Sequence, residues 1–238
     1  MARPVPPDRL ANLVAAATRV FIAQGYRRTQ MADVAAAMGV AKGTLYLAVA
    51  SKAALFDLAV RYADAEFPPE PPKRWPLPTP KPGSTLALVR RRLGEAAIGP
   101  RLQQALREPP PADVRAELTA IIAELYARLS AQRTAIKLLD RCAVDHPALA
   151  ALWFGSGRGA QLSAVHEYLV ARAAAGRLRP LADLGVAARL VIESAAMWAV
   201  HRHFDPAPVA VDESAVEPTV TAALVAALLP DADAGRAR

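Results

Sequence analysis

The sequence predicts an all-α protein. Its 238 residues are 53% hydrophobic, enough to fill a substantial core, and aromatic residues make up only 5%. The apolar residues are mostly Ala, Leu and Val, and they recur at spacings of three and four along most of the chain. Runs of β-branched residues bounded by turn signals are scarce. Strands are therefore not expected, and the length allows one large domain or two ordinary ones.

Most of the net charge of +7 lies near the N-terminus. Residues 1–52 contain seven Lys or Arg and two Asp, a net charge of +5, whereas the other 186 residues contribute +2. A segment this basic indicates a polyanionic partner such as nucleic acid, with ordinary solubilising charge as the alternative. The single cysteine excludes an internal disulfide, and no 18 apolar residues run without a charge, so we expect a cytoplasmic protein with no membrane partner.

Four helices are predicted in the N-terminal quarter of the chain. Thr29 and Ser51 have side chains suited to cap the second and fourth helices. Gly25 and Gly39 end the first and second, because glycine takes the positive φ that a helix C-terminus favours. The helices are expected at about residues 8–25, 29–39, 41–46 and 51–67.

The second and third helices are short and joined by a tight glycine turn, which predicts a helix-turn-helix at about residues 30–49. In such a motif the second helix enters the major groove of DNA. Lys42, Gly43 and Thr44 form its first turn and Tyr46 adds a ring and a hydroxyl, so these residues are predicted at the DNA. Lys52, at the start of the fourth helix, is predicted to meet the flanking phosphates.

Residues 21–56 closely resemble the N-terminal domain of the tetracycline-repressor (TetR) family of bacterial transcription regulators. The resemblance extends over residues 7–67 and implies a three-helix DNA-binding domain of the helix-turn-helix type, followed by a helical ligand-binding and dimerisation domain. The matching residues are Phe21, Gly25, Tyr26, Thr29, Val34, Ala35, Gly39, Val40, Lys42, Gly43, Leu45, Tyr46, Ser51, Lys52 and Leu55.

The resemblance also implies how such a protein works. It implies a homodimer that binds a palindromic operator in double-stranded DNA and is most often released by a small ligand. Thr29 would cap the second helix and touch a phosphate, and Lys52 would clamp the DNA backbone. The resemblance implies no enzymatic activity and no cofactor, and the sequence itself contains no catalytic motif.

Three positions depart from the family pattern. Ala41 stands where a capping Ser or Thr is common, and Ala48 and Val49 replace a His or Tyr and a Phe. These changes predict weaker operator binding, for which Arg27 and Arg28 could compensate through phosphate contacts. The alternative function is a helical adaptor that binds proteins through its basic N-terminus and its proline-rich segment.

The rest of the chain is predicted as a proline-rich linker or loop at residues 68–83, a helical effector-binding and dimerisation domain at 84–230 and a disordered tail at 231–238. Eight prolines between Pro68 and Pro82 forbid a helix in the linker. In the second domain, Gly155 and Gly176 are expected to end helices. Its helices are expected at about residues 86–97, 99–108, 114–129, 131–144, 147–155, 162–175, 183–204 and 213–229.

The second domain contains few bulky side chains in an Ala-rich background, and these are the candidates for a ligand pocket. They are Tyr126, Trp153, Phe154, Tyr168, Met197 and Trp198. Because few polar groups accompany them, a small apolar or aromatic effector is predicted. The helix predicted at 183–204 is apolar on two faces, which indicates a second partner such as the same helix of another subunit. The residues predicted at this dimer interface are Val191, Ala195, Trp198, Val220 and Leu224.

One pair of residues has the spacing of metal ligands. Cys142 and His146 are four residues apart, but Pro147 interrupts the helix there and no other ligand cluster lies nearby in the sequence. A polar helix end is therefore the preferred interpretation, and no metal site is predicted.

Overall fold

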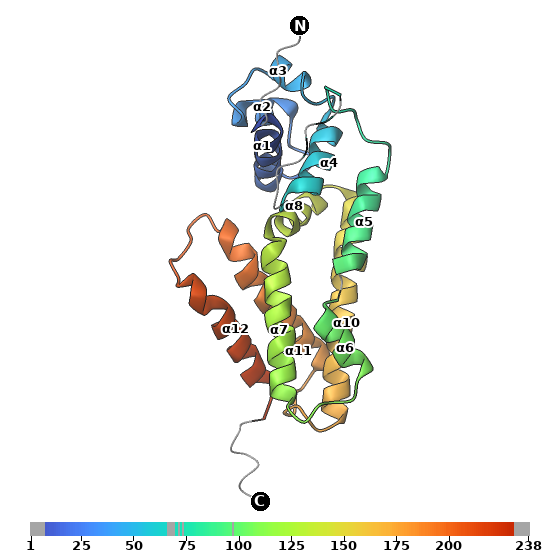
Figure 1. The fold of residues 1–238 in the computed structure, drawn as a ribbon, viewed down its shortest axis with the longest axis vertical. Helices are drawn as coiled ribbons and strands as arrows, with labels where there is room; N and C mark the ends of the chain where they lie inside the picture. Colours follow the sequence, from blue (N-terminus) through green and yellow to red (C-terminus); the bar gives the residue numbers. More distant parts are fainter. Residues whose placement is uncertain (1–7, 66–69, 71, 73, 97, 231–238) are drawn as a thin grey trace, which may run out of the picture. The chain divides into compact units, whose positions relative to one another are not determined.

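The computed structural model describes the chain except for residues 1–7, 66–69, 71, 73, 97 and 231–238. The predicted tail and Phe67 lie outside the described residues. Over the described residues the regular structure is helical, which confirms the all-α prediction (Figure 1). None of the helices in this part of the chain is both long and apolar enough to cross a bilayer.

The helices follow one another in the order α1 Asp8–Gln24, α2 Met31–Ala37, α3 Lys42–Tyr46, α4 Lys52–Tyr62, α5 Ser84–Ala96, α6 Pro100–Arg107, α7 Val114–Ala131, α8 Arg133–Ala143, α9 Pro147–Ala150, α10 Arg158–Ala174, α11 Leu184–Ala199 and α12 Glu213–Leu228. A π-helical stretch, Ala151–Gly157, lies between α9 and α10, and a 3₁₀ turn, His201–Phe204, follows α11.

The chain forms two compact units. Unit 1 comprises Met1–Leu93 and Thr134–Ser156, and unit 2 comprises Gly94–Arg133 and Gly157–Arg238. The predicted division near residue 84 differs from this one, because α8 and α9 join the N-terminal helices. Asp64 explains part of the difference: its carboxylate accepts the N–H groups of Thr134 and Ala135, at 3.0 and 2.7 Å, and so caps the start of α8.

In unit 1, α1 packs against α4 and α2, and α2 packs against α3. The apolar stripe of α1 supplies the centre of the core, where Leu13, Ala17 and Phe21 are fully buried. Phe21 contacts Phe56 of α4 edge to face, with ring centroids 5.3 Å apart. Cys142 of α8 is also fully buried in this core.

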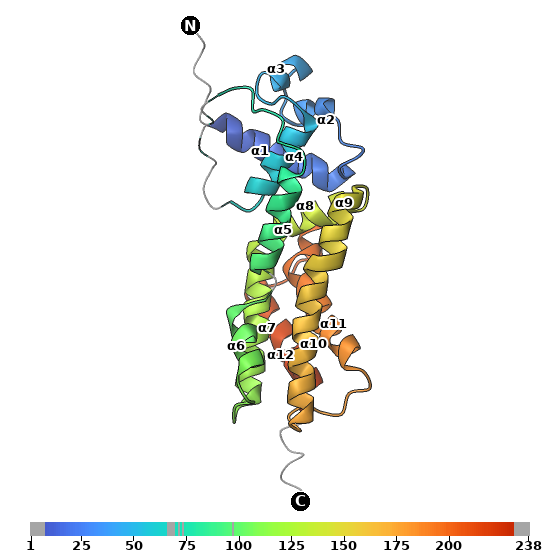
Figure 2. The same ribbon diagram turned by 90° about the vertical axis from the view of Figure 1, so that its right-hand side faces the viewer.

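In unit 2, α7, α10, α11 and α12 form a helical bundle, with α6 against α7 and α10 (Figure 2). The helix α11 contacts α7, α10 and α12, so it lies at the centre of the bundle. Its buried side includes Ala188, Val191 and Ala195. Small side chains on this side let the neighbouring helices approach closely.

Several predicted boundaries are confirmed and others need correction. Gly25, Gly39 and Gly176 adopt φ values of 81°, 68° and 68° at the ends of helices, as predicted. Gly155 ends no helix, because the chain continues through the π-helical stretch into α10. The fourth helix ends at Tyr62, before the expected position near 67. The helix predicted at 183–204 ends at Ala199 and continues only as a 3₁₀ turn.

Candidate functional site

The short helix α3 presents one polar face to solvent and one apolar face to the core. Leu45 points inward and is fully buried, whereas the other α3 side chains and the adjoining Leu47 are exposed. The exposed residues are Lys42, Gly43, Thr44, Tyr46 and Leu47. This separation leaves a charge, a hydroxyl, a phenol and an apolar side chain free to meet a partner, which are the groups that contact phosphates, base edges and thymine methyls in DNA.

Leu47 was not among the residues singled out from the sequence. Its side chain is 67% exposed, although leucine usually lies in a core at such a position. The sequence pattern could not identify Leu47, because Leu45 and Leu47 are equivalent apolar residues until the orientation of the helix is known.

The prediction that Thr29 caps the second helix is wrong. Gln30 is the N-cap of α2, and its own N–H donates to the Asp33 carboxylate at 2.8 Å. Thr29 is 1% exposed, and its hydroxyl donates to the Gly25 carbonyl at 2.7 Å. The hydroxyl therefore closes the turn between α1 and α2, and it is buried, whereas the predicted phosphate contact requires an exposed group.

The turn after α1 is held by two charged side chains. Asp145 accepts the N–H groups of Tyr26 and Arg27, at 3.1 and 2.9 Å. Lys52 donates to the carbonyls of the same two residues, at 3.0 and 3.2 Å, and its ammonium lies 4.8 Å from the Tyr26 ring centroid. An ammonium has three N–H donors, so a phosphate contact by Lys52 stays a prediction beside this structural role.

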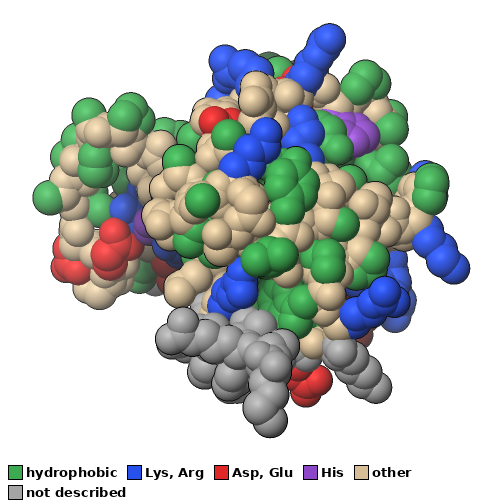
Figure 3. Space-filling view, turned by 90° about the horizontal axis from the view of Figure 1, so that it is seen from above, with side chains coloured by type: hydrophobic (Ala, Val, Ile, Leu, Met, Phe, Trp, Pro, Cys, Tyr) green, Lys and Arg blue, Asp and Glu red, His purple; other side chains and the backbone are tan. Residues whose placement is uncertain are grey.

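Arg27 and Arg28 are exposed next to this turn. Arg28 Nε donates to the Gln24 carbonyl at 3.0 Å, while the Arg27 guanidinium extends from a backbone fixed by Asp145. Figure 3 views the molecule from the end that carries α3, and Lys and Arg side chains stand at several places on this face. The residues of the basic segment that are exposed on unit 1 include Arg19, Arg27, Arg28 and Lys42.

Cys142 and His146 are structural residues. Burial raises the pKa of the Cys142 thiol to about 12, so the thiol stays protonated. His146 Nδ1 accepts the Leu149 N–H at 3.3 Å and caps α9, while its ring contacts that of Tyr26. No cluster of three or more metal-ligating side chains occurs among the residues that the structure describes.

The comparisons with known proteins agree with this geometry. Residues 13–59 match the family model of bacterial regulatory proteins of the tetR family, which spans α1 to α4. The N-terminal domain of the chain is that of a tetR-family regulator. Its function is DNA-binding transcriptional regulation. No curated protein matches the sequence.

Solved structures support the fold of the whole chain. The ketosteroid transcriptional regulator KstR2 of Mycobacterium tuberculosis aligns with a TM-score of 0.55 and 16% identity, covering 97% of this chain and 99% of that one. A tetR-family regulatory protein from Rhodococcus RHA1 aligns with a TM-score of 0.52 and 16% identity, covering 93% and 98%. At this identity the likeness concerns the fold, and it extends beyond the helix-turn-helix to the C-terminal helices of the regulator.

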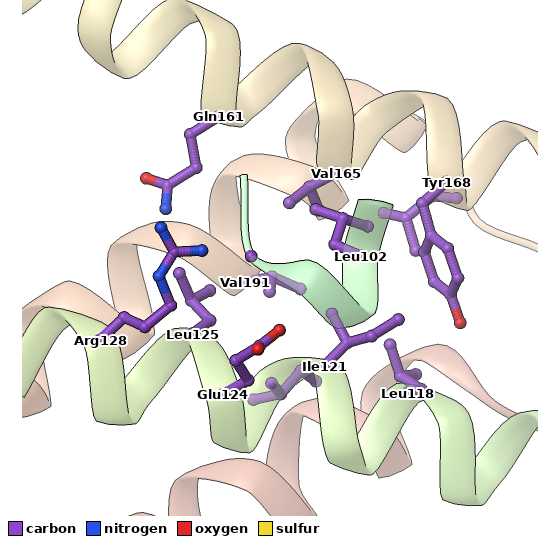
Figure 4. Close-up of a pocket in the computed structure, with 13 residues that line it drawn as sticks. Leu102, Leu118, Ile121, Glu124, Leu125, Arg128, Gln161, Val165, Tyr168 and Val191 are labelled. Atoms are coloured by element: carbon purple, nitrogen blue, oxygen red, sulfur yellow. The ribbon is translucent and has the colours of Figure 1, made fainter. Parts of the chain in front are cut away.

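Unit 2 of the regulator contains a cavity of about 30 Å³ between α6, α7, α10 and α11 (Figure 4). Glu124, Arg128 and Gln161 gather at one side of it, whereas the remaining side is apolar. The apolar lining consists of Leu102, Leu118, Ile121, Ile122, Leu125, Val165, Leu169 and Val191, with Gly99 and the ring of Tyr168 completing the wall.

The polar side of the cavity is organised by the start of α6. Glu124 accepts the Arg101 N–H at 3.0 Å, which satisfies a free donor of the first turn of α6. A Cβ on Gly99 would lie 2.5 Å from the Glu124 carboxylate and 2.7 Å from an Arg128 guanidinium nitrogen. Glycine at this position therefore permits both charged side chains to reach the helix start.

Of the predicted ligand-pocket residues, the structure brings only Tyr168 to this cavity. Trp153 belongs to the core of unit 1, where its indole N–H donates to Asp140 at 3.1 Å. Tyr126 is buried elsewhere in unit 2, and Phe154, Met197 and Trp198 are exposed. These five residues lie away from this cavity, because ring size does not indicate which side of a helix faces inward, and their contact with a ligand stays a prediction.

The predicted dimer residues also need correction. Val191, Ala195, Val220 and Leu224 are buried inside the subunit, and Val191 lines the cavity. The exposed apolar side of α11 consists instead of Val186, Leu190, Met197 and Trp198. Of the five predicted residues only Trp198 is exposed. The sequence could not distinguish the buried side of α11 from the exposed side, because both are apolar.

A buried ion pair lies behind the Tyr168 ring. Arg172 is 1% exposed and donates to both carboxylate oxygens of Glu117, at 2.8 and 2.9 Å, and to the Ala105 carbonyl. The Tyr168 hydroxyl donates to Glu117 at 2.9 Å, and burial raises the pKa of Tyr168 above its usual value. This network joins α6, α7 and α10 and fixes one wall of the cavity.

Proposed function

We propose that this regulator is a repressor that binds an inverted-repeat operator as a homodimer and is released when a small effector occupies unit 2. The observation that carries the proposal is the exposed face of α3, with Lys42, Thr44, Tyr46 and Leu47 directed away from a buried Leu45. A helix of this kind reads one half-site, and a two-fold dimer reads two.

The dimer surface is proposed on α11 and α12. The exposed apolar side chains of α11 adjoin a side of α12 on which small residues are exposed. The small residues are Ala215, Thr219, Ala222, Ala223, Ala226 and Ala227. Bulky residues on one helix and small ones on the next can interdigitate with a two-fold copy of the same surface, which supports an isologous contact.

The effector is proposed to be a small molecule with an apolar or aromatic body and a single polar end. The apolar lining of the cavity suits the body, and Arg128 and Gln161 suit the polar end. Effector pockets are usually about 300–1,000 Å³, far larger than this cavity of about 30 Å³. The effector would therefore separate the helices of unit 2 as it enters, and this change would be coupled to DNA release by about 1–3 kcal/mol.

The function is tested by selecting duplexes from a randomised pool with the purified protein. We expect recovery of an inverted repeat bound as one dimer. Leu190→Arg should weaken binding, because it places an unpaired charge in the proposed dimer contact. Val170→Arg is the matched control, since Val170 is similarly exposed on α10 of the same unit. Failure to enrich any sequence, with no salt-sensitive binding to duplex DNA, would favour the adaptor alternative.

A further inference from the structure

The proline-rich segment does not serve merely as a spacer. Residues 74–80, which we call the strap, lie along the C-terminal side of α3 within unit 1. The Leu77 N–H donates to the Ala48 carbonyl at 2.9 Å, and the Ala50 N–H donates to the Leu77 carbonyl at 2.9 Å. The hydroxyls of Ser51 and Thr79 form one further hydrogen bond, at 2.8 Å.

The strap also reaches the middle of α3 through Arg9 of α1. The Arg9 guanidinium lies 5.9 Å from the centroid of the Trp75 ring, and the same group donates to the Thr44 carbonyl at 3.2 Å. Trp75 and Leu77 are half-buried and pack against the core of unit 1. The strap therefore contacts the segment after α3 directly and contacts α3 itself through Arg9.

The sequence of the strap suits this role. Trp75, Leu77 and Thr79 alternate with Pro76, Pro78 and Pro80. A residue before proline is restricted to extended backbone, and proline itself has a fixed φ, so the segment loses little conformational entropy when it pairs. Leu77 keeps the N–H that the pairing uses, whereas the prolines on either side have none to leave unsatisfied.

The helix that the strap contacts is weakly stabilised by its own sequence. It is five residues long, and its N-cap, Ala41, has the backbone conformation of a cap but no side-chain acceptor. Helices this short are not stable alone and depend on tertiary contacts. The residues after it, Ala48 and Val49, are small and fully buried, and Val49 pairs with Leu77.

We propose that the strap is a positioning element of the DNA-binding surface, in which Trp75 and Leu77 hold α3 in the orientation that reads the operator. The strap residues act through α3 rather than by touching DNA. The proposal rests on the DNA-binding function proposed above. It predicts that changes in the strap alter the discrimination between DNA sequences and leave the number of phosphate contacts nearly unchanged.

The test uses the full-length protein and a duplex selected from a randomised pool by the wild type. We expect Trp75→Ala and Leu77→Gly each to lower the ratio of affinities for selected and scrambled duplexes about tenfold, the contribution of one base contact. The dependence of affinity on salt should keep its slope, because no phosphate contact is removed. Arg74→Ala, a change at the exposed strap neighbour, is the matched control and should alter neither quantity.

Two further measurements separate positioning from loss of folding and from direct contact. In the free protein, amide hydrogen exchange should accelerate at residues 44–49 in the strap variants but not in α1 or α4. Ala41→Ser supplies the missing cap, so adding it to Trp75→Ala should recover most of the discrimination. A reduced salt slope for Arg74→Ala would identify the strap as a DNA contact and overturn the proposal. Absence of recovery on capping would also overturn it, because the strap would then not act through α3.

Unchanged discrimination and exchange in both strap variants would also overturn it. Failure of the proposed function gives a different result: the wild type would then enrich no duplex at all. The circular dichroism melting curve of each variant shows whether unit 1 has remained folded. Should Trp75→Ala unfold it, Leu77→Gly provides the same comparison, because it removes the packed side chain and loosens the strap while keeping the N–H and carbonyl of the pairing.

Discussion

The anchored turns of unit 1 and the cavity wall of unit 2 are held by charged side chains in different ways. In unit 1 charged side chains bond to backbone groups: Asp145 and Lys52 hold the turn after α1, and Asp64 holds the start of α8. In unit 2 the most buried charge, Arg172, is paired mainly with another side chain, Glu117. Backbone anchors fix the path of the chain, whereas pairs of side chains fix only the spacing of helices.

This difference fits the two tasks of the regulator. A recognition helix must keep a set orientation, and unit 1 supports α3 through contacts from α1 and the strap. In the proposed function unit 2 must admit an effector, and unit 2 has a small cavity with one wall fixed by the network of Arg172, Glu117 and Tyr168. The comparison predicts that unit 2 is sensitive to loss of its ion pair and that unit 1 is sensitive to changes of backbone at its anchored turn.

The largest effect is expected for Glu117→Ala. It leaves Arg172 charged and unpaired at a site where its side chain is 2% exposed, and it removes the acceptor of Tyr168. We expect the free energy of unfolding to fall by about 3–5 kcal/mol. Glu193→Ala is the control, because its pair with Arg189 is exposed, and it should cost less than about 1 kcal/mol. Urea denaturation measures both, and equal losses would contradict the role assigned to the buried pair.

Gly25→Ala should have the next largest effect. Gly25 has a φ of 81°, and a Cβ there would lie 2.8 Å from the Asp145 carboxylate that holds the turn. Backbone strain alone predicts a loss of about 1–2 kcal/mol. Gly94→Ala is the control, because that glycine is in α5 with open space around it, and alanine there should stabilise the protein by up to about 1 kcal/mol. Calorimetry that finds the two variants alike would contradict the anchored-turn account.

The smallest effect concerns pH. Burial, followed by the nearby Arg133, lowers the pKa of His203 below its usual 6.5. The unfolded chain therefore takes up this proton first as the pH falls, so unit 2 loses stability below about pH 6.5. His203→Gln should reduce this loss when urea midpoints are compared at about pH 7.5 and about pH 5.5. An undiminished loss in the variant would assign the pH dependence to other groups.

The sequence predicted the helices well because their signals are local. Gly25, Gly39 and Gly176 end helices at positive φ, and the apolar stripe of α1 faces the core. The exposed face of α3 also agrees with the residues expected at DNA. These features depend only on neighbours three or four positions away in the chain.

The remaining features depend on contacts between distant residues. Asp145 holds a turn that lies 119 residues earlier, and Leu77 pairs with Ala48 across the proline-rich segment. Nothing in the local pattern indicates such partners. The two apolar sides of α11 are equally ambiguous: Val191 faces the cavity and Leu190 faces solvent, yet they are adjacent in the sequence. The packing of the whole bundle decides which side of α11 is buried.

The central claim is that DNA is bound by the α3 face of unit 1 and not by the charges of unit 2. Fluorescence anisotropy of a selected duplex across a salt series tests it with Lys42→Ala on α3 and Arg107→Ala on α6, both changes at exposed residues. We predict that Lys42→Ala lowers the slope of log affinity against log salt by about 1, through loss of one phosphate contact, and that Arg107→Ala leaves it unchanged. An unchanged slope for Lys42→Ala with a reduced slope for Arg107→Ala would contradict the claim.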